Sequence, residues 1–189
     1  MAIRIIAGTA RGRLISSGPS GPDIRPILAR VRKSLFDILR PKIVDSVFLD
    51  LYAGLGTVGL EALSRGARKV VFIENQKTAV SAIKKNLDYL GFSEKAKIYQ
   101  TDISQGLGWL PEQFDLIFLG PPYCRRAERD VNGLVSPTLK LISNARILLD
   151  SGWIIAQHHK KEIISLPAGY QVFRQTRYGD TCLTFIHKV

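Results

Sequence analysis

One stretch of the sequence, residues 47–63, limits what this chain can fold into. It begins with the short apolar run Val47–Leu51, which suits a strand buried on both faces of a parallel sheet. The glycines at positions 54, 56 and 59 then permit a tight turn, a close approach to a ligand and the packing of a helix against the strand. We therefore expect this strand to be the first of an α/β sheet, with a ligand bound at the loop that follows it.

An acid inside this strand, Asp50, narrows the class of ligand. The spacing of Gly54, Gly56 and Gly59 matches the dinucleotide fingerprint, but that motif alone is a weak indication, and nicotinamide-binding strands are generally apolar at this point. A carboxylate here can accept hydrogen bonds from a cationic amine, so we expect a ligand that carries an ammonium group. A glycine turn that only joins a strand to a helix is the alternative.

The rest of the chain alternates between strand-like and helical patterns. Apolar runs predict parallel strands at residues 69–74, 96–102, 114–119 and 152–158, and two adjacent runs at 170–177 and 181–187 predict an antiparallel pair. Helical spacing occurs at 28–39, 60–63, 77–90 and 134–149, and residues 107–111 are expected to close a short helix. The pattern predicts an α/β, Rossmann-like sheet of about seven strands, with a parallel centre and an antiparallel edge pair.

Three of the predicted strands end in or carry an acid: Asp50, Glu74 and Asp102. Ligands of open parallel sheets lie outside the carboxyl ends of the strands, so these carboxylates should converge on one crevice. Glu74 follows the glycines by about 20 residues, which is the position of an acid that binds the two ribose hydroxyls of a nucleoside. Any one of these acids could instead cap a helix, but three of them together indicate a nucleoside site.

The fourth predicted strand runs directly into Gly120-Pro121-Pro122-Tyr123. Proline cannot extend a strand, so the two prolines should fix a rigid turn. Its carbonyls and the ring of Tyr123 are expected to face the crevice, where the ring could stack on a base.

Positive charge is concentrated near the amino terminus. The 189 residues include 27 Lys and Arg against 16 Asp and Glu, a formal net charge of +11. Nine of these basic residues, against two acids, lie within residues 1–42. A basic surface could simply favour solubility, but this concentration favours RNA or DNA as a partner, because phosphate contacts supply most non-specific affinity. We expect a basic hairpin and linker over residues 1–25 and one globular domain over residues 26–189.

Other classes of protein are disfavoured. The two cysteines, Cys124 and Cys182, are too few and too far apart for a disulfide framework or a zinc site, so we expect reduced thiols and no metal. No apolar run reaches the length of a membrane span, and the amino terminus lacks the pattern of a signal peptide. The chain is therefore expected in the cytoplasm.

The acid before the glycine loop, the acids after the second and third strands and the Pro-Pro-Tyr turn together resemble the class I S-adenosylmethionine-dependent methyltransferases. Within that class the sequence is most similar to the bacterial RsmD type, the guanine-N2 methyltransferases of 16S ribosomal RNA. The resemblance extends over nearly the whole chain. It includes Arg-Ile-Ile-Ala-Gly at residues 4–8, Arg-Val-Arg at 30–32 and Gly-Leu-Glu-Ala-Leu-Ser-Arg-Gly at 59–66.

This resemblance implies roles for individual residues. Asp50 and the turn at 54–56 would hold the methionine part of S-adenosylmethionine, Glu74 the ribose, and Asp102 with Ile103 the adenine. The cofactor-binding residues implied are Asp50, Ala53, Gly54, Gly56, Thr57, Glu74, Asn75, Asp102 and Ile103. The catalytic turn would comprise Gly120, Pro121, Pro122 and Tyr123, with the ring of Tyr123 stacked on a guanine flipped out of the RNA. Ribosomal RNA, or the assembling small subunit, would contact Arg4, Arg11, Arg13, Arg25, Arg30 and Arg32.

The sequence departs from the family pattern at Gly120. The family has Asp or Asn there, whose side-chain oxygen orients the guanine amino group. Methyl transfer depends chiefly on positioning, so the carbonyls of Gly120 and Pro121, or a side chain such as His158 or His159, could take over. The alternatives are an RNA-binding protein with weak or lost catalysis, and a nicotinamide oxidoreductase, which Asp50 and the Pro-Pro-Tyr turn disfavour.

Overall fold

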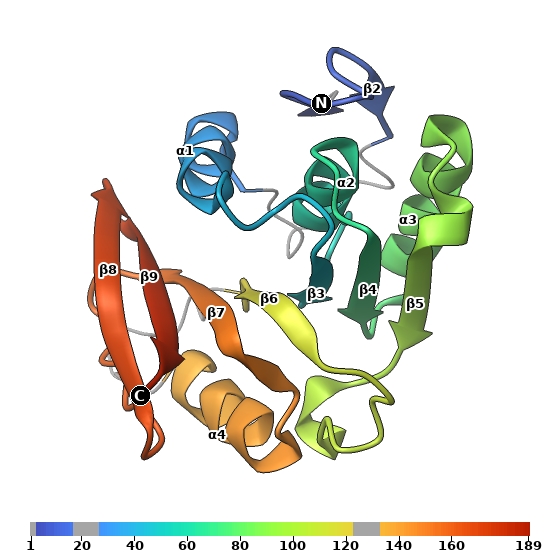
Figure 1. Ribbon diagram of the computed structural model, residues 1–189. Coiled ribbons are helices and arrows are strands. Elements are labelled where there is room, and N and C mark those ends of the chain that lie inside the picture. The colour runs from blue at the N-terminus through green and yellow to red at the C-terminus, as the bar shows by residue number, and fades with distance from the viewer. Residues whose placement is uncertain (1–2, 17–26, 123–132) are drawn as a thin grey trace.

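A computed structural model describes residues 3–16, 27–122 and 133–189 of the chain (Figure 1). Its centre is a seven-stranded sheet whose strands are, in spatial order, β5 (Ala96–Gln100), β4 (Lys69–Glu74), β3 (Val47–Leu51), β6 (Phe114–Leu119), β7 (Leu148–His159), β9 (Thr181–Lys188) and β8 (Tyr170–Tyr178). The first five are parallel, whereas β9 pairs antiparallel with both β7 and β8. The predicted sheet, with its parallel centre and antiparallel edge pair, is confirmed.

Helices cover both faces of this sheet (Figure 1). The helices α1 (Ala29–Leu39), α2 (Thr57–Ser64) and α3 (Lys77–Leu90) lie on one face, and α4 (Val135–Ala145) lies on the other. Alternate side chains of β3 enter two separate cores, since Phe48 packs on the side of α1 to α3 and Leu49 on the side of α4. The structure thus covers β3 on both faces, as its continuous apolar sequence predicts.

The order of the strands creates a crevice in the middle of the sheet. The chain builds outward from β3 to β4 and β5, then crosses back to place β6 on the other side of β3. Such a reversal is where ligands bind in open α/β sheets, because the loops after the two neighbouring strands leave in opposite directions. The switch point here lies between Asp50 on β3 and the turn that follows β6.

A small hairpin precedes the large sheet. Its strands β1 (Ile3–Arg4) and β2 (Leu14–Ile15) pair antiparallel. Ile5, Ala10 and Ile15 are buried in the same core as α1 and α2. The hairpin therefore packs against α1 and α2 and belongs to the same hydrophobic core.

Backbone contacts fix the hairpin to the carboxyl-terminal half of α2. The buried carboxylate of Glu61 accepts hydrogen bonds from the amides of Ile6 (2.8 Å) and Ala7 (3.0 Å). Gly8 has φ of +85°, and a Cβ on it would lie 1.7 Å from the carbonyl oxygen of Ser64. Only glycine fits there, because the hairpin backbone touches the helix backbone directly.

Two helical expectations were wrong in their boundaries. The segment 107–111 forms turns, and the helical piece there is the 3-10 helix η2 (Ile103–Gln105), which begins after Asp102; a second 3-10 helix, η1 (Ser93–Lys95), precedes β5. The helix expected at 134–149 ends at Ala145, since Arg146 takes φ of +53°, and a left-handed residue ends an α-helix. The apolar residues that follow continue into β7, where Leu148 pairs with Phe114 of β6.

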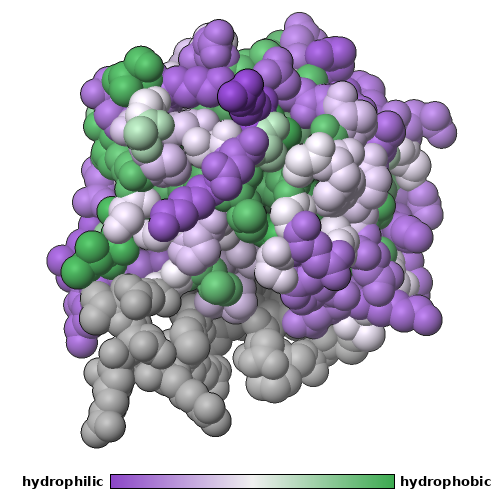
Figure 2. All heavy atoms as spheres, turned by 90° about the horizontal axis from the view of Figure 1, so that it is seen from below, coloured by the Kyte–Doolittle hydropathy of each residue, from purple (hydrophilic) through white to green (hydrophobic). Residues whose placement is uncertain are grey.

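Figure 2 shows the side of the molecule that lies lowest in Figure 1, where α4 is found. Hydrophobic side chains appear there in small groups among hydrophilic ones. Among the helices that the structure describes, none is long and apolar enough to cross a membrane.

Candidate active site

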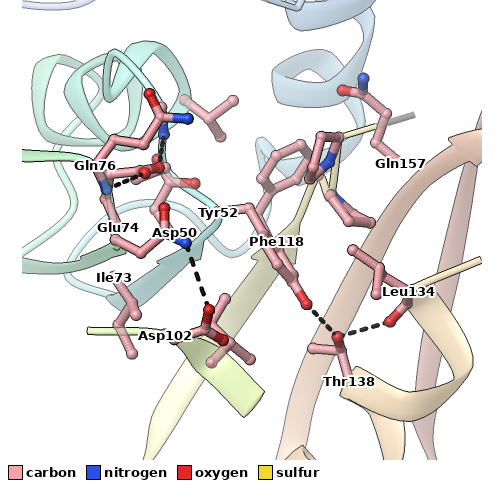
Figure 3. A pocket seen from close by; sticks show the side chains of 18 of the residues that line it. Asp50, Tyr52, Ile73, Glu74, Gln76, Asp102, Phe118, Leu134, Thr138 and Gln157 are labelled. Carbon is pink, nitrogen blue, oxygen red and sulfur yellow. Dashed lines mark hydrogen bonds between the residues drawn. The ribbon is translucent and has the colours of Figure 1, made fainter. Parts of the chain in front are cut away.

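A pocket of about 630 Å³ opens at the switch point of the sheet (Figure 3). Its size is typical of sites for small molecules and cofactors. Residues from the loops after β3, β4, β5 and β6 line it, and the amino-terminal part of α4 closes it from the other face. Most of the residues predicted from the sequence meet here: Asp50, Ala53, Gly54, Thr57, Glu74, Asn75, Asp102, Ile103, Gly120, Pro121 and Pro122.

Some predicted residues lie elsewhere. Gly56 does not line the pocket. It precedes α2 with φ of +71°, its amide donates to the carbonyl of Ala53 (2.8 Å), and a Cβ on it would lie 3.0 Å from Ile83. Gly56 therefore supports the conformation of the glycine loop without facing the pocket. Tyr123 and Arg25 are outside the described residues.

Asp50 lies at the bottom of the pocket and is 1% exposed. Its Oδ2 accepts a hydrogen bond from the amide of Gly59 (2.9 Å) in the first turn of α2. Burial raises the pKa of Asp50 to about 8, because a charged carboxylate loses its hydration there; the Gly59 hydrogen bond lowers it and the charge of Glu74 raises it further. A cation bound next to Asp50 would relieve this cost, so the site favours a ligand with positive charge.

Glu74, at the end of β4, holds the glycine loop in place. Its Oε2 accepts from the amide of Gly54 (2.7 Å) and its Oε1 from the amide of Gln76 (2.9 Å). A carboxylate oxygen has a second lone pair, so both atoms can still accept from a hydroxyl in the pocket. Glu74 thus combines a structural contact with a position suited to a ribose.

Asp102 follows β5 and lies on the exposed rim of the pocket. Its Oδ1 accepts from the amide of Ser104 (2.8 Å), and its Oδ2 lies 3.5 Å from Nδ2 of Asn75 in the loop after β4. Hydrogen bonds from Ser104 and, more weakly, from Asn75 lower the pKa of Asp102, so it is a stable anion. The acids of three strands, predicted to converge, do line one pocket.

The turn after β6 forms the opposite wall of the pocket. The amide of Gly120 donates to the carbonyl of Leu51 on β3 (3.4 Å), which places the turn directly beside the end of β3. Pro121 is buried and Pro122 is exposed. The rigid corner and the acids therefore share one site.

Several residues that line the pocket were not predicted to belong to it. They include Ile27 before α1, Tyr52, Phe118 and Gln157 near the strand ends, and Leu134, Pro137, Thr138 and Leu141 of the α4 region. Tyr52 has φ of +59°, and its hydroxyl lies 2.8 Å from Oγ1 of Thr138, which joins the first strand to α4 (Figure 3). The positive φ of Tyr52 has no signal in the sequence, and α4 reaches the pocket only through tertiary packing.

His158 is a structural residue. It is 3% exposed, its Nε2 lies 2.8 Å from Oγ1 of Thr184 on β9, and its Nδ1 lies 2.9 Å from the carbonyl of His159. Burial lowers the pKa of His158, so the neutral ring is favoured. Neither His158 nor His159 lines the pocket, and the idea that they replace the missing acid is not supported.

The predicted RNA-binding arginines are divided between two places. Arg4 and Arg11 are exposed on the hairpin, and Arg30 is exposed in the first turn of α1, close in sequence to Ile27 at the pocket. Arg13 is half-buried, with its guanidinium 4.2 Å from the centre of the Tyr89 ring. The hairpin docks at the far end of α2, an eight-residue helix about 12 Å long.

The expected surface position of Arg32 is wrong. Its side chain is 1% exposed, and its Nε lies 3.7 Å from Oε2 of Glu61, while Nη2 donates to the carbonyl of Arg4 (2.5 Å). Helical spacing placed Arg32 away from the apolar stripe of α1, but it could not show that the hairpin and α2 cover that side. Arg32 links these elements instead of contacting RNA.

The pocket fits S-adenosylmethionine by the chemistry of its donors. A buried carboxylate with a raised pKa, Asp50, suits the ammonium of the methionine part. Gly54, whose φ is +54°, lets the loop backbone approach a ligand closely, and Glu74 and Asp102 offer acceptors farther along the crevice. Among the described residues, no three His, Cys, Asp or Glu side chains form a group that could hold a metal ion.

A family model described as "Conserved hypothetical protein 95" matches residues 3–187 of the chain. The chain belongs to this family. Ribosomal RNA small subunit methyltransferase D of Escherichia coli (strain K12) is 33% identical over 179 residues, which is 94% of this chain and 86% of the relative. YlbH of Bacillus subtilis (strain 168) is 31% identical over 190 residues, which is 98% of this chain and 99% of the relative.

A solved structure agrees with this assignment to the Conserved hypothetical protein 95 family. The structure of yhhF from Escherichia coli superimposes with a TM-score of 0.84 at 30% identity, covering 100% of this chain and 98% of that chain. The resemblance to S-adenosylmethionine-dependent methyltransferases of the RsmD type is therefore confirmed over the whole fold.

Proposed function

We propose that this protein transfers a methyl group from S-adenosylmethionine to the exocyclic N2 amine of a guanine in small-subunit (16S) ribosomal RNA. The observation that carries the proposal is the meeting of Asp50, Glu74 and Asp102 with the Gly120-Pro121-Pro122 turn in one pocket. The similarity to ribosomal RNA small subunit methyltransferase D supports the choice of substrate.

Each acid would bind a different part of the cofactor. Asp50 pairs with the ammonium of the methionine part, and Gly54 brings the loop amides close to it. Glu74 accepts from the ribose hydroxyls, while Asp102 and Ile103 border the adenine. The cofactor, when bound, supplies the methyl group as a sulfonium. The turn at 120–122 lines the same pocket as the acids, so it would hold the methyl acceptor next to the bound cofactor.

The chemical step is a direct displacement that needs little proton chemistry from the protein. The amine nitrogen of the guanine forms the new bond to the methyl carbon as the carbon–sulfur bond breaks, and the bonding electron pair stays on sulfur. The nitrogen then loses one proton to solvent. The rigid turn contributes by holding the base in line with the methyl group, and such positioning can supply a large part of the barrier reduction.

The exposed arginines would supply the RNA-binding surface. Arg30 is exposed in the first turn of α1, three residues after Ile27 of the pocket, and Arg4 and Arg11 are exposed on the hairpin. Together these arginines would bind ribosomal RNA or the assembling small subunit through phosphate contacts. The cytoplasm is the compartment where such a substrate is available.

The test is the incorporation of labelled methyl groups into 16S ribosomal RNA, and into small subunits that lack the modification, followed by nucleoside analysis. We expect N2-methylguanosine, and we expect none with Asp50→Asn, which removes the charge that the cofactor needs. Labelling at another nucleoside would refute the N2 assignment. If the wild-type protein binds S-adenosylmethionine but labels nothing, while Gly120→Asp does, the RNA-binding protein with lost catalysis is the correct alternative.

A further inference from the structure

Gly120 brings only backbone to the wall of the pocket where the methyl acceptor must lie, but a neighbouring strand brings an amide side chain to the same place. Gln157 lies on β7 and lines the pocket together with Gly120. In the parallel pairing of β6 with β7, Leu119 is opposite Ala156. Gly120 and Gln157 each follow that pair by one residue, so they lie side by side at the carboxyl ends of the two strands.

The side chain of Gln157 points to the same face of the sheet as Asp50. Asp50 pairs with Phe118, and Phe118 pairs with Ile155. Residues two apart in a strand share a face, so Gln157 shares the face of Ile155. A Cβ on Gly120 would lie 3.9 Å from Oε1 of Gln157, and carboxyl oxygens extend about 2.4 Å beyond their own Cβ. The Gln157 oxygen therefore borders the space that an acceptor side chain at position 120 would fill (Figure 3).

The strand that carries Gln157 has a neighbouring strand on each side. β7 lies between β6 and β9, and Gln157 is paired with Leu183 of β9. The side chain is half-buried. An acceptor on a central strand is fixed more precisely than one on a loop, which is what orientation of a reacting group requires.

We propose that Oε1 of Gln157 accepts a hydrogen bond from the exocyclic amine of the RNA base and aims its nitrogen at the methyl group. The inference rests on the proposed function. As the nitrogen forms its bond to carbon it gains positive charge, and an amide oxygen directed at its N–H stabilises that charge. Gln157 takes up no proton, so the proton lost by the nitrogen goes to solvent.

The first experiment measures binding without turnover. The protein is saturated with S-adenosylhomocysteine and titrated with 2-aminopurine riboside, which carries the amine, or with purine riboside, which lacks it. We expect the wild-type protein to bind the amine-bearing nucleoside roughly threefold or more tightly, as one added hydrogen bond allows. Gln157→Ala should abolish this preference, and Gln171→Ala, a control on the exposed edge strand β8, should keep it. Equal preference in wild type and Gln157→Ala would overturn the inference.

The second experiment uses the methyl-transfer rate at saturating cofactor. Gln157→Ala should lower kcat at least tenfold while the affinity for S-adenosylhomocysteine stays within twofold of wild type. The double variant Gly120→Asp with Gln157→Ala should recover most of the rate, because it returns an acceptor to the same space. The backbone of Gly120 has no positive φ, and among the described residues only the Phe118 ring, 3.0 Å from the new Cβ, must move slightly. Unchanged kcat in Gln157→Ala, or failure of the double variant to recover, would refute the role.

A pH profile separates this role from a purely structural one. Gln157→Glu should be active at high pH and should lose rate as the pH falls through the pKa of the new carboxyl group, because the protonated acid is a poorer acceptor. The wild-type rate at saturating cofactor should lack this acidic limb, and identical profiles would contradict the inference. If the wild-type protein methylates nothing, the proposed function fails, whereas the nucleoside titration still decides the placement of Gln157.

Discussion

Gly59 shows how closely one residue can tie the ligand loop to the sheet. Its amide donates to the buried carboxylate of Asp50 (2.9 Å), and a Cβ on it would lie 2.2 Å from Cε1 of Phe72 on β4. Its backbone has no positive φ, so glycine is required because a larger side chain would collide with Phe72. The sequence predicted that the glycines of the motif let the helix pack against the sheet, and at Gly59 this packing is the close contact with Phe72.

Gly59→Ala should therefore destabilise the protein. The added methyl group must displace the Phe72 ring or α2, which costs about 1–3 kcal/mol as overpacking. Gly108→Ala is the matched control, since no atom of the described residues lies within 4 Å of its new Cβ, and it should change the free energy of unfolding by less than about 0.5 kcal/mol. Urea denaturation of the two variants measures the difference. Equal stability would mean that the loop can move away from β4.

The charge state of Asp50 should make cofactor binding depend on pH. The pKa of Asp50 is about 8 in the free protein, so the carboxyl is mostly protonated at pH 6. A bound ammonium favours the carboxylate and lowers this pKa, so binding releases a proton and the affinity rises with pH. Between about pH 6 and 7.5 the rise should approach tenfold per pH unit.

Calorimetry with S-adenosylhomocysteine, in buffers of different ionisation enthalpy, measures both the affinity and the released proton. Asp50→Asn should bind more weakly and without proton release. Asp150→Asn is the control, because the side chain of Asp150 is fully exposed, pairs with Lys188 and does not line the pocket. Wild-type affinity that is independent of pH would show that Asp50 is already charged.

At the scale of elements, a buried charge cluster joins α1, α2 and the hairpin. Glu61 is fully buried, and its carboxylate contacts Nε of Arg65 (2.7 Å), Nε of Arg32 (3.7 Å) and two hairpin amides. Burial lowers the pKa of Arg32, and the charge of Glu61 partly offsets this, so Glu61 stabilises the charged form of Arg32. Removing one partner would leave the other charge buried and uncompensated.

Glu61→Gln should lower the free energy of unfolding by about 3–5 kcal/mol, the usual cost of breaking a buried pair. Asp37→Asn removes an exposed partner of Lys33 (2.7 Å) on α1 and should cost less than about 1 kcal/mol. Both are measured by urea denaturation. A loss below about 1 kcal/mol for Glu61→Gln would show that the hairpin is held by its apolar contacts alone.

The elements that could be predicted from sequence are those whose signals are local. The glycine loop, β4 (Lys69–Glu74) and α3 (Lys77–Leu90) were found with their boundaries because apolar spacing and Gly91 mark them directly. The end of α4 was missed because the left-handed Arg146 carries no glycine-like signal. Arg32 was misplaced because its cover comes from Glu61, 29 positions later.

At the scale of the whole molecule, positive charge should govern RNA binding. Arg11 and Arg30 are exposed on the hairpin and on α1. If both contact phosphates, the double variant Arg11→Ala with Arg30→Ala should weaken binding to a 16S ribosomal RNA fragment. It should also reduce the slope of log affinity against log salt by about 1.4, at about 0.7 per contact with single-stranded RNA.

Filter binding or fluorescence anisotropy at several salt concentrations measures this slope. Lys97→Ala is the control, because Lys97 is an exposed basic residue on the edge strand β5, away from α1 (Figure 1). An unchanged slope in the double variant would place the RNA on another surface.

The residues of the site that lie at the ends of strands could be predicted from the sequence. Those that reach the pocket from other elements through packing could not. Asp50, Glu74 and Asp102 follow from the rule that ligands lie at the carboxyl ends of parallel strands. Tyr52, Thr138 and α4 enter the pocket through packing across the sheet. Gln157 belongs to the site because β7 is parallel to β6, and that register is not visible in either segment alone.

The docking of the hairpin on α2 also sets an order for events during synthesis. Strands of two residues cannot persist by themselves in water, and the groups that hold residues 6–10 come from Glu61 and Ser64. Residues 3–16 are synthesised before α2 and must therefore wait for Glu61 and Ser64 before they acquire their folded shape. Until then this segment, which carries Arg4, Arg11 and Arg13, lies close to ribosomal RNA, the kind of polymer that the finished protein is proposed to modify.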